Sequence, residues 1–367
     1  MLLFEISLTD FRSYQRKNFR FTSGLTIMIG PNASGKTNIL EAIFLLSTGK
    51  SFRAEQDREM IGWGKEIGRV SSKITQLSNN PINQLISEKK DLEIVLTTGI
   101  VGREKVPFKK FSINGVGKRM LDFVGNLKVV LFWPEDLELV TDSPSLRRRY
   151  LDFVLTQIDR EYRRTIISYE KGLRQRNKLL EAIREGRAHH HQLIFWDQLL
   201  IKDGGYISKK REEYIDYINS AKLKVQSAKL PDYNLVYGRS VISETRLAQY
   251  KEEEVAAGVT LVGPHRDNFQ FSIYNFQTKT TRDLSRYGSR GEQRLAILWL
   301  KLGELAYIEK IADDKPLLLL DDIFSELDHE HRKIIFEVIG NQQTIMTTTD
   351  LHFIEKNRLG NGKIIEI

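Results

Sequence analysis

A short apolar run that leads directly into a glycine-rich loop constrains this chain more than any other segment. Leu25 to Ile29 is apolar apart from one threonine, and Gly30 to Thr37 matches the pattern G-x-x-x-x-G-K-[ST]. Apolar residues at helical spacing follow from Ile39 to Leu46. The sequence therefore predicts a buried strand, a phosphate-binding loop and a helix in immediate succession.

Such a loop binds phosphates because its glycines let backbone N–H groups converge and the following helix adds the positive end of its dipole. The Lys36 ammonium would bridge the β- and γ-phosphates, and the Thr37 hydroxyl would bind Mg²⁺. The alternative is a plain glycine turn. The residues that we expect to contact the nucleotide are Gly30, Pro31, Asn32, Ala33, Ser34, Gly35, Lys36, Thr37 and Asn38.

Two adjacent carboxylates end a second apolar run, Leu317 to Leu320. A buried strand that ends in Asp321 and Asp322 needs a cation or a reacting water there, because desolvating two acids without compensation is costly. Asp321 suits the Mg²⁺ shell, and Asp322 suits a general base that positions water. The alternative is a pair of solvated loop acids that cap the next helix.

A third motif, Ser289 to Gln293, precedes a helix that is apolar on nearly every side. The Ser289 hydroxyl and the first helical N–H groups could bind an anion, although an ordinary N-cap before a core helix has the same pattern. The order favours a functional role: glycine loop, long gap, this motif, and then the acidic strand end.

The motifs in this order resemble the ABC-type ATPase heads of the SMC and RecF families. Ser289 to Glu292 resembles their signature motif, Ser325 to Asp328 resembles their D-loop, and Thr347 to Asp350 lies where their switch strand ends. Blocks that resemble the RecF family run through essentially the whole chain, which we identify as a member of it. These blocks are Leu8 to Tyr14, Gly30 to Asn38, Lys50 to Arg53, Trp133 to Leu137, Arg147 to Asp152 and Gly263 to Asp267.

The resemblance implies an α/β head of the ABC/SMC type, with a mixed sheet and flanking helices, split by a helical, short coiled-coil-like second lobe. It implies ATP and Mg²⁺ as cofactors and Lys36, Asp322 and Ser289 as catalytic residues. It also implies a head-to-tail dimer with two ATP molecules between the subunits. The nucleotide contacts implied beyond the loop are Ser289, Gly291, Asp328 and Thr349.

The same resemblance implies a role in DNA replication and repair. ATP would close the dimer on duplex or gapped DNA, bound through phosphates without base readout. Weak, DNA-stimulated hydrolysis would release it. RecO and RecR are the implied partners, and the implied task is to help place the recombinase RecA on gapped DNA.

Some features depart from the wider ABC pattern. Glu292 stands where Gln is usual, Asp322 stands where most ABC ATPases carry Glu, and the switch region from Thr347 to Asp350 has no histidine. A shorter base would sit closer to the water or act through a second one, which fits slow hydrolysis. No clear glutamine loop stands out, and Trp133 to Leu137 is the candidate for its place.

The length of 367 residues suits about two domains. We assign residues 1–140 and 245–367 to the ATPase head and residues 141–244 to a helical arm. A heptad seam from Tyr162 to Ile183, interrupted by Arg176, predicts the first helix of a hairpin. The hairpin would turn near Gly186 to His191 and return from Phe195 to Lys224. Gly204-Gly205 would be a weak point of that second helix.

Alternating patterns predict the remaining strands, and helical spacing predicts two further helices. The helices are Glu292 to Ile311 and Glu330 to Val338. The strands are Leu2 to Leu8, Phe19 to Phe21, Asp91 to Thr98, Phe108 to Ile113, Leu127 to Trp133, Asn234 to Tyr237, Gly258 to Leu261, Phe269 to Tyr274 and Thr344 to Thr348.

Composition excludes several classes of protein. The absence of cysteine rules out a disulfide scaffold, a thiolate metal site and a cysteine nucleophile. The N-terminus does not resemble a signal peptide, and no apolar run approaches about 18 residues, so we expect a soluble, cytoplasmic protein without a membrane span. A net charge of +8 makes a polyanionic partner plausible without establishing one.

Basic residues follow one side of the first arm helix, displaced from the seam. A stripe of this kind could track DNA phosphates, or it could be a solvated face, since acidic residues such as Glu161 and Glu170 lie nearby. The candidate DNA-binding residues are Arg160, Arg164, Lys171, Arg174 and Lys178.

Three other clusters favour structural roles. His189 to His191 falls at the presumed turn and is best explained as an exposed loop. Arg147 to Arg149 suits structural or interlobe pairing better than a nucleic-acid contact. The block from Gly263 to Asp267 suits a turn held by internal ion pairs.

Three rival functions remain open. A transporter ATPase subunit should show a glutamine loop, should place its signature about 100 residues after the lysine and should lack an arm. A metabolic kinase needs neither a signature serine nor a dimer. A DNA scaffold whose ATP only holds its shape is compatible with Asp322.

Overall fold

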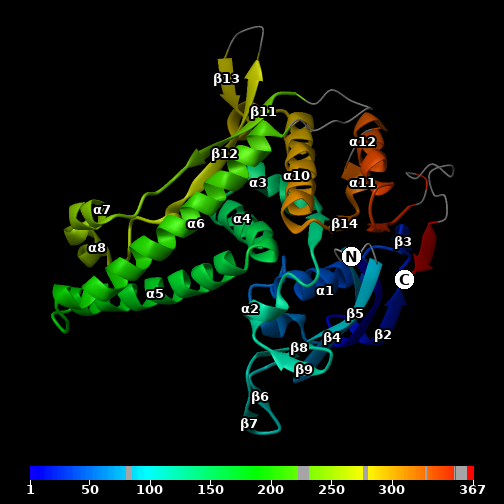
Figure 1. Cartoon of the computed structure of the whole chain (residues 1–367), viewed down its shortest axis with the longest axis horizontal. Helices are drawn as coiled ribbons and strands as arrows, with labels where there is room; N and C mark the ends of the chain where they lie inside the picture. Colours follow the sequence, from blue (N-terminus) through cyan, green and yellow to red (C-terminus); the bar gives the residue numbers. More distant parts are fainter. Residues whose placement is uncertain (80–84, 222–230, 276–279, 327–328, 351, 353–361) are drawn as a thin grey trace. The chain divides into compact units, whose positions relative to one another are not determined.

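The structure is a computed structural model, and it describes the whole chain except residues 80–84, 222–230, 276–279, 327–328, 351 and 353–361 (Figure 1). Its described part forms two compact units, which are described separately below. The first contains residues 1–136 and 304–367, and the second contains residues 137–221 and 231–303. The first boundary lies near the expected one, whereas residues 245–303 group with the arm and not with the head. The reason is that the strand Asn268–Asn275 pairs with the strand Tyr233–Gly238, which lies before residue 244.

A five-stranded parallel sheet in the order β10-β14-β15-β3-β16 lies in the first unit. Its central strands are almost entirely buried, as is usual for parallel strands with both faces covered. Since the carboxyl ends of parallel strands share one edge, the loops after β3, β14 and β15 emerge together. The strands are β3 Leu25–Ile29, β10 Val129–Phe132, β14 Leu317–Asp321, β15 Thr344–Thr348 and β16 Lys363–Glu366.

An antiparallel six-stranded sheet, in the order β2-β1-β4-β5-β8-β9, forms the other layer of this unit. The two strands predicted at Leu2 to Leu8 and Phe19 to Phe21 are confirmed and pair as a hairpin, but the second strand already begins at Tyr14, so only Arg12 and Ser13 connect them. The strands are β1 Leu2–Phe11, β2 Tyr14–Arg20, β4 Ile67–Asn79, β5 Leu85–Thr97, β8 Lys109–Ile113 and β9 Val116–Lys118.

Helix α1, Lys36–Thr48, contacts strands of both sheets, among them β14 and β4. It is buried on nearly every side from Ile39 onward, as expected of an apolar helix enclosed between two layers. The shorter elements of this part of the chain are η1 Asp57–Met60, β6 Ile100–Val101, β7 Glu104–Lys105, α2 Met120–Phe123, η2 Pro134–Leu137, α11 Ile323–Glu326 and α12 His329–Ile339.

The second unit contains the predicted helical hairpin. Helix α5, Arg160–Arg184, and helix α6, Ile194–Ser220, are joined through the short η3, His190–Leu193 (Figure 1). The expected weak point at Gly204-Gly205 does not interrupt α6. A β-carbon on Gly204 would lie 2.8 Å from Ile242 Cγ2, so this glycine permits close packing. Helices α3 Glu138–Thr141 and α4 Pro144–Ile158 precede the hairpin.

A three-stranded antiparallel sheet, in the order β11-β12-β13, completes this unit with several short helices. The strand predicted at Gly258 to Leu261 is wrong, because Gly258 ends α8 in a left-handed conformation and the N–H groups of Thr260 and Leu261 donate to side chains. The remaining elements are β11 Tyr233–Gly238, α7 Glu244–Gln249, α8 Lys251–Ala257, η4 Pro264–Arg266, β12 Asn268–Asn275, β13 Thr280–Asp283 and α9 Leu284–Tyr287. Helix α10, Arg290–Ala312, belongs to this unit up to Gly303 and to the first unit beyond it. No helix of the described residues is both long and apolar enough to cross a membrane.

Candidate functional site

The loop between β3 and α1 has the conformation that its glycines permit. Gly35 is the N-cap of α1 with φ 102°, and no side chain caps the helix. A β-carbon on Gly35 would lie 2.8 Å from Tyr14 Oη, and one on Gly30 would lie 2.6 Å from the carbonyl oxygen of Ile367. The loop therefore leaves the first N–H groups of α1 without a side-chain acceptor, which is the arrangement that binds an anion.

The Lys36 side chain arches back over this loop. Its ammonium donates to the carbonyl oxygens of Gly30 at 2.7 Å and Pro31 at 2.8 Å. Burial lowers the pKa of Lys36, while the negative charges of Asp322 and Asp321 raise it. A largely buried cation is thus held above the loop, beside two carboxylates.

Strand β14 delivers Asp321 to the same edge of the parallel sheet. Its Oδ1 accepts a hydrogen bond from Thr37 Oγ1 at 3.1 Å and another from Thr347 Oγ1 at 2.6 Å. The structure thus brings together the two residues that the sequence assigned to Mg²⁺. Thr347, at the end of β15, is a contributor that the sequence did not single out, although it lies in the quoted switch segment.

Asp322 follows with φ 47°, a left-handed conformation that is uncommon for residues other than glycine. Its backbone N–H donates to Thr347 Oγ1 at 3.0 Å and to the Thr347 carbonyl at 3.2 Å. Strain of this kind persists only where neighbouring groups fix the backbone, and it concentrates at functional sites. Thr347 therefore holds the Asp321 carboxylate and the backbone of Asp322.

A buried carboxylate on α1 organises two arginines beside the loop. Glu41 is fully buried and accepts from Arg12 Nη2 at 2.6 Å, Arg53 Nη2 at 2.9 Å and Ser51 Oγ at 2.5 Å. Burial alone would raise the pKa of Glu41, but the hydrogen bonds from Arg12 and Ser51 and the charge of Arg53 hold it below the usual value. The arginines stay partly exposed, at 21% and 31% of their side chains.

The amide of Asn38 links this cluster to the loop. It donates to Ser13 Oγ at 3.0 Å and accepts from Arg53 Nη2 at 2.8 Å. Sequence reasoning placed Arg12 and Arg53 in family blocks but assigned them no role. A glutamate on the apolar face of α1, at position 41, is the signal that could have revealed the cluster, because a buried carboxylate requires cations.

The third motif lies at the N-terminus of α10, in the second unit. Ser289 N–H donates to Glu292 Oε2 at 2.8 Å, and Glu292 N–H donates to Ser289 Oγ at 3.3 Å, which together form a capping box. The backbone hydrogen bond from Ser289 lowers the pKa of Glu292, and Arg282 pairs with the same carboxylate. Ser289 and Gly291 are exposed.

The other predicted nucleotide contacts are less defined. Thr349 is half-buried just beyond β15, and Asp328 lies outside the described residues. Trp133, the start of the candidate glutamine-loop segment, packs edge-on against Phe52 with the ring centroids 4.7 Å apart. The roles of these three residues stay predictions.

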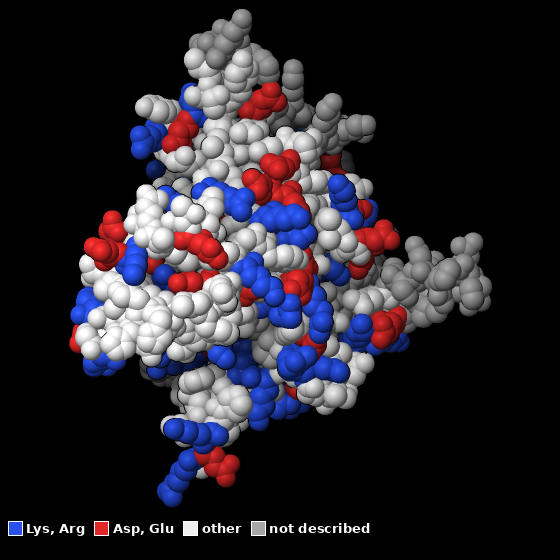
Figure 2. Space-filling model, turned by 60° about the vertical axis from the view of Figure 1, so that its left-hand side comes forward, with Lys and Arg blue, Asp and Glu red and all other residues white. Residues whose placement is uncertain are grey.

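The predicted basic stripe is exposed along α5. The stripe residues fall on the face opposite the buried residues Tyr162, Tyr169 and Leu180, because spacings of four, seven, three and four keep side chains on one side of a helix. Arg164 pairs with Glu161 at 2.6 Å. On the face of the molecule in Figure 2, basic and acidic side chains are interspersed. The stripe residues are Arg160, Arg164, Lys171, Arg174 and Lys178.

A buried network of ion pairs and hydrogen bonds holds the block from Gly263 to Asp267 in place. Fully buried Asp267 accepts from Arg211 Nη1 at 3.1 Å and Tyr237 Oη at 2.5 Å, and Arg211 Nη2 also donates to Asp152 at 2.9 Å. Burial lowers the pKa of His265 to about 4, so it is neutral at physiological pH. The prediction of a turn held by internal ion pairing is confirmed.

The arginine run before this network is structural as well. Arg147 donates to the carbonyls of Leu139 at 2.7 Å and Val140 at 3.0 Å, and Arg148 donates to the carbonyl of Asp267 at 2.9 Å. His189 to His191 lies in the exposed turn before α6. Within the described residues, no group of three or more His, Asp or Glu could hold a metal ion.

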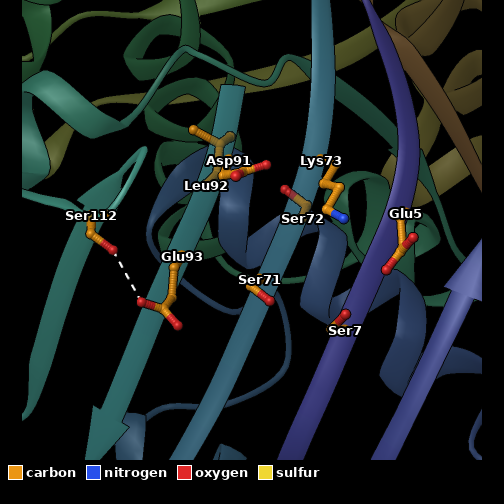
Figure 3. A pocket seen from close by; sticks show the side chains of 10 residues that line it. Glu5, Ser7, Ser71, Ser72, Lys73, Asp91, Leu92, Glu93 and Ser112 are labelled. Atoms are coloured by element: carbon orange, nitrogen blue, oxygen red, sulfur yellow. Dashed lines mark hydrogen bonds between the residues drawn. The ribbon is translucent and has the colours of Figure 1, made fainter. Parts of the chain in front are cut away.

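A hollow of about 230 Å³ lies on the polar outer face of the antiparallel sheet (Figure 3). Two of its three carboxylates already have partners: Glu93 accepts from Ser112 at 3.1 Å and pairs with Arg69, and Glu5 pairs with Arg20. The hollow is therefore best explained as a solvated sheet face.

Comparison with known proteins bears on this geometry. Residues 2–360 match the family model described as RecF/RecN/SMC N terminal domain. The chain is 34% identical to the DNA replication and repair protein RecF of Lachnoclostridium phytofermentans, over 100% of this chain and 98% of that protein. It is 37% identical to the RecF protein of Herpetosiphon aurantiacus, over 98% and 96% respectively.

Solved structures agree with the sequence relatives. The structure of the recombination mediator protein RecF-ATPrS in the RecFOR pathway matches with a TM-score of 0.84 and 30% identity, over 100% of this chain and 96% of that one. An Smc head domain with an extended coiled coil from Pyrococcus furiosus matches with a TM-score of 0.51 and 16% identity, over 99% and 92%, which supports the fold alone. The expected ABC/SMC-type head is thus confirmed, and the chain belongs to the RecF family within the RecF/RecN/SMC group.

Proposed function

We propose that this protein is a weak, Mg²⁺-dependent ATPase that dimerises on ATP and binds DNA during recombinational repair and replication. The convergence of Lys36, Thr37 and Asp321 at the carboxyl edge of the parallel sheet is the observation that carries the proposal. The RecF relatives, described as DNA replication and repair proteins, supply the biological setting.

In this proposal, the uncapped N–H groups of α1 and the Lys36 ammonium bind the triphosphate. Asp322 lies next in the chain to Asp321 and acts as the base that positions water. Its short side chain and strained backbone fit slow turnover better than fast turnover. Slow hydrolysis of ATP would then set how long the protein stays bound to DNA.

The donor set fits Mg²⁺. Thr37 Oγ1 and Asp321 Oδ1 lie 3.1 Å apart and are hard oxygen ligands. Mg²⁺ typically takes only one or two protein oxygens and completes its shell with phosphates and water, which agrees with so small a set. The ion would neutralise charge that develops on the phosphates.

We place Ser289 of one copy against the ATP held by the loop of a second copy. The signature resemblance supports this arrangement, and so does the exposed position of Ser289 at a helix N-terminus. Two such contacts would relate the copies by a two-fold axis and close both sites together. Asp328 and Thr349 would join the same contacts.

We assign the exposed face of α5 to DNA phosphates. Its five basic residues lie on one side of the helix, and phosphate contacts of this kind carry no sequence preference. RecO and RecR are proposed as partners because the matching RecF structure is described as part of the RecFOR pathway.

The first experiment measures binding of a labelled duplex with ATP present, by fluorescence anisotropy. We expect Lys36→Met and Ser289→Arg each to abolish the ATP-dependent part of binding while their melting temperatures stay close to that of the wild type. If ATP-dependent binding and dimerisation survive both changes, the clamp proposal fails.

A second experiment tests the DNA face. The logarithm of the DNA-binding constant falls linearly with the logarithm of the salt concentration. Replacing the five stripe residues with glutamine should make this slope less steep by about 0.9 for each phosphate that is no longer neutralised. A control variant replaces three other exposed basic residues, Arg16, Lys17 and Arg20 on β2, with glutamine and should leave the slope unchanged. An unchanged slope in the stripe variant would remove α5 from the interface.

A third experiment separates the ATPase from a scaffold that only holds ATP. Asp322→Asn should lower the single-turnover hydrolysis rate at least about 100-fold, the lower end of the range for a general base, while ATP-dependent dimerisation persists. A wild-type protein that shows no hydrolysis in a single turnover would favour the scaffold.

A further inference from the structure

One large aromatic side chain of the first unit is completely exposed. Trp63 has a relative exposure of 101%, and it is flanked by Gly62 and Gly64. Lys65 N–H donates to the Gly62 carbonyl at 3.0 Å, and Gly64 has φ 72°, so Trp63 lies at the tip of a tight turn. Because glycines flank it, no neighbouring side chain in the turn covers either face of the indole.

This turn is fixed to the end of β1. Gly62 N–H donates to the Asp10 carbonyl at 2.7 Å, and Arg12 N–H donates to the Met60 carbonyl at 2.9 Å. Phe11 and Ile61 form an antiparallel bridge, and Lys65 pairs with Asp10 at 3.5 Å. The indole is therefore presented from an ordered backbone.

The end of β1 in turn borders the phosphate-binding loop. Ser13, directly after Arg12, accepts from Asn38 Nδ2 at 3.0 Å, and its Oγ would lie 3.0 Å from a β-carbon on Gly35. Asn38 lies in the first turn of α1, directly after the loop whose backbone N–H groups face the α- and β-phosphates in sites of this kind. The nucleoside leaves the triphosphate at the α-phosphate, so it emerges on the side of the loop that the β1 end borders.

We propose that Trp63 stacks on the adenine base of bound ATP, a role that rests on the nucleotide binding proposed above. An indole is the largest aromatic face that a side chain offers, and stacking on a base is insensitive to the base's hydrogen-bonding groups. Trp63 thus raises the affinity for ATP and takes no part in its hydrolysis.

The test compares two ligands that share the phosphates but differ in the base: MgATP and magnesium tripolyphosphate, each titrated by calorimetry. Trp63→Ala should weaken MgATP binding about tenfold and leave tripolyphosphate binding within about twofold, whereas Trp63→Phe should restore most of the ATP affinity. MgGTP should lose affinity to a similar degree as MgATP. Phe195→Ala, at another exposed aromatic position, should change none of these values.

Fluorescence gives an independent signal. ATP should quench part of the wild-type tryptophan emission, and this part should be absent in Trp63→Phe. Equal ATP affinity in the wild type and Trp63→Ala, or an equal loss for both ligands, would overturn the stacking role. Failure of the wild type to bind either ligand would instead refute the proposed nucleotide site. A Trp63→Ala protein that binds ATP normally but no longer dimerises would assign the indole to a contact between copies.

Discussion

The N-termini of α1 and α10 carry the two motifs that the sequence linked to ATP, yet they are built in opposite ways. At α1 the N-cap is Gly35, and neither a side-chain cap nor an acidic residue occupies the first turn. At α10 the Ser289 hydroxyl and the Glu292 carboxylate close the first turn on themselves. The first N–H groups of α1 therefore have no side-chain acceptor, whereas the first turn of α10 is capped by its own Glu292 carboxylate.

This difference suggests different roles for the two helix ends. An open N-terminus with a lysine above it can hold phosphates within one copy of the chain. At α10 a phosphate would meet the negative charge of Glu292, so any contact there must displace or outcompete the cap. The two ends thus suit a strong primary site and a weaker contact that depends on a second copy.

The largest expected effect is on ATP affinity at the N-terminus of α1. Lys36→Met should lower ATP affinity about 100-fold, because this variant cannot form charge-assisted hydrogen bonds to the phosphates. Equilibrium binding of ATP measures the change, with Lys17→Met on β2 as a control that should bind normally. An affinity within threefold of the wild type would contradict the role of α1 as the primary site.

Two glycine substitutions sharpen the contrast. Gly35→Ala should destabilise the protein by about 1–3 kcal/mol and impair ATP binding, since φ is 102° and the new β-carbon would lie 2.8 Å from Tyr14 Oη. Gly291→Ala meets nothing within 4 Å and should be neutral or stabilise α10 by up to about 1 kcal/mol. Chemical denaturation checks both values, and equal destabilisation of the two variants would remove the contrast.

The smallest effect concerns the closed end. The pKa of Glu292 is lowered in the folded state, so its stabilising effect is present above the unfolded value of 4.5 and is lost as the pH falls through the lower folded value. Glu292→Gln should therefore reduce the loss of stability between pH 5 and pH 3, at a cost of about 1 kcal/mol near neutrality.

The same variant removes the resident charge, so ATP-dependent dimerisation should strengthen severalfold. Thermal melts across the pH range and sedimentation with ATP measure the two effects. Weaker dimerisation of Glu292→Gln would show that the carboxylate assists the contact.

The sequence predicted β3 and β14 well because both are short apolar runs, and it predicted β15, Thr344–Thr348, from β-branched residues around two apolar ones. It also assigned Thr37 and Asp321 to one Mg²⁺ ion from their motifs, and the two side chains meet in the structure because the carboxyl ends of parallel strands share an edge. The hydrogen bond from Thr347 to Asp321 was not predicted, because the two residues are distant in the chain and threonine is common in strands.

Other features depend on contacts that a linear pattern does not encode. The apolar residues at 258–261 suggested a strand, but Asn177 and Glu254 satisfy the N–H groups of Thr260 and Leu261. The Glu41 cluster joins β1, α1 and the following loop through side chains alone. Local periodicity describes the backbone well, and it describes buried charge poorly.

Sedimentation velocity of mixed variants tests the central claim most directly. With ATP, the wild type should form dimers, whereas Lys36→Met and Ser289→Arg alone should stay monomeric. In an equimolar mixture of the two variants, a mixed dimer has one complete site, because the Ser289→Arg copy supplies Lys36 and the Lys36→Met copy supplies Ser289. ATP should therefore restore a dimer population between those of the single variants and the wild type. Dimers of either variant alone, or a mixture that stays monomeric at concentrations where the wild type is fully dimeric, would contradict the account.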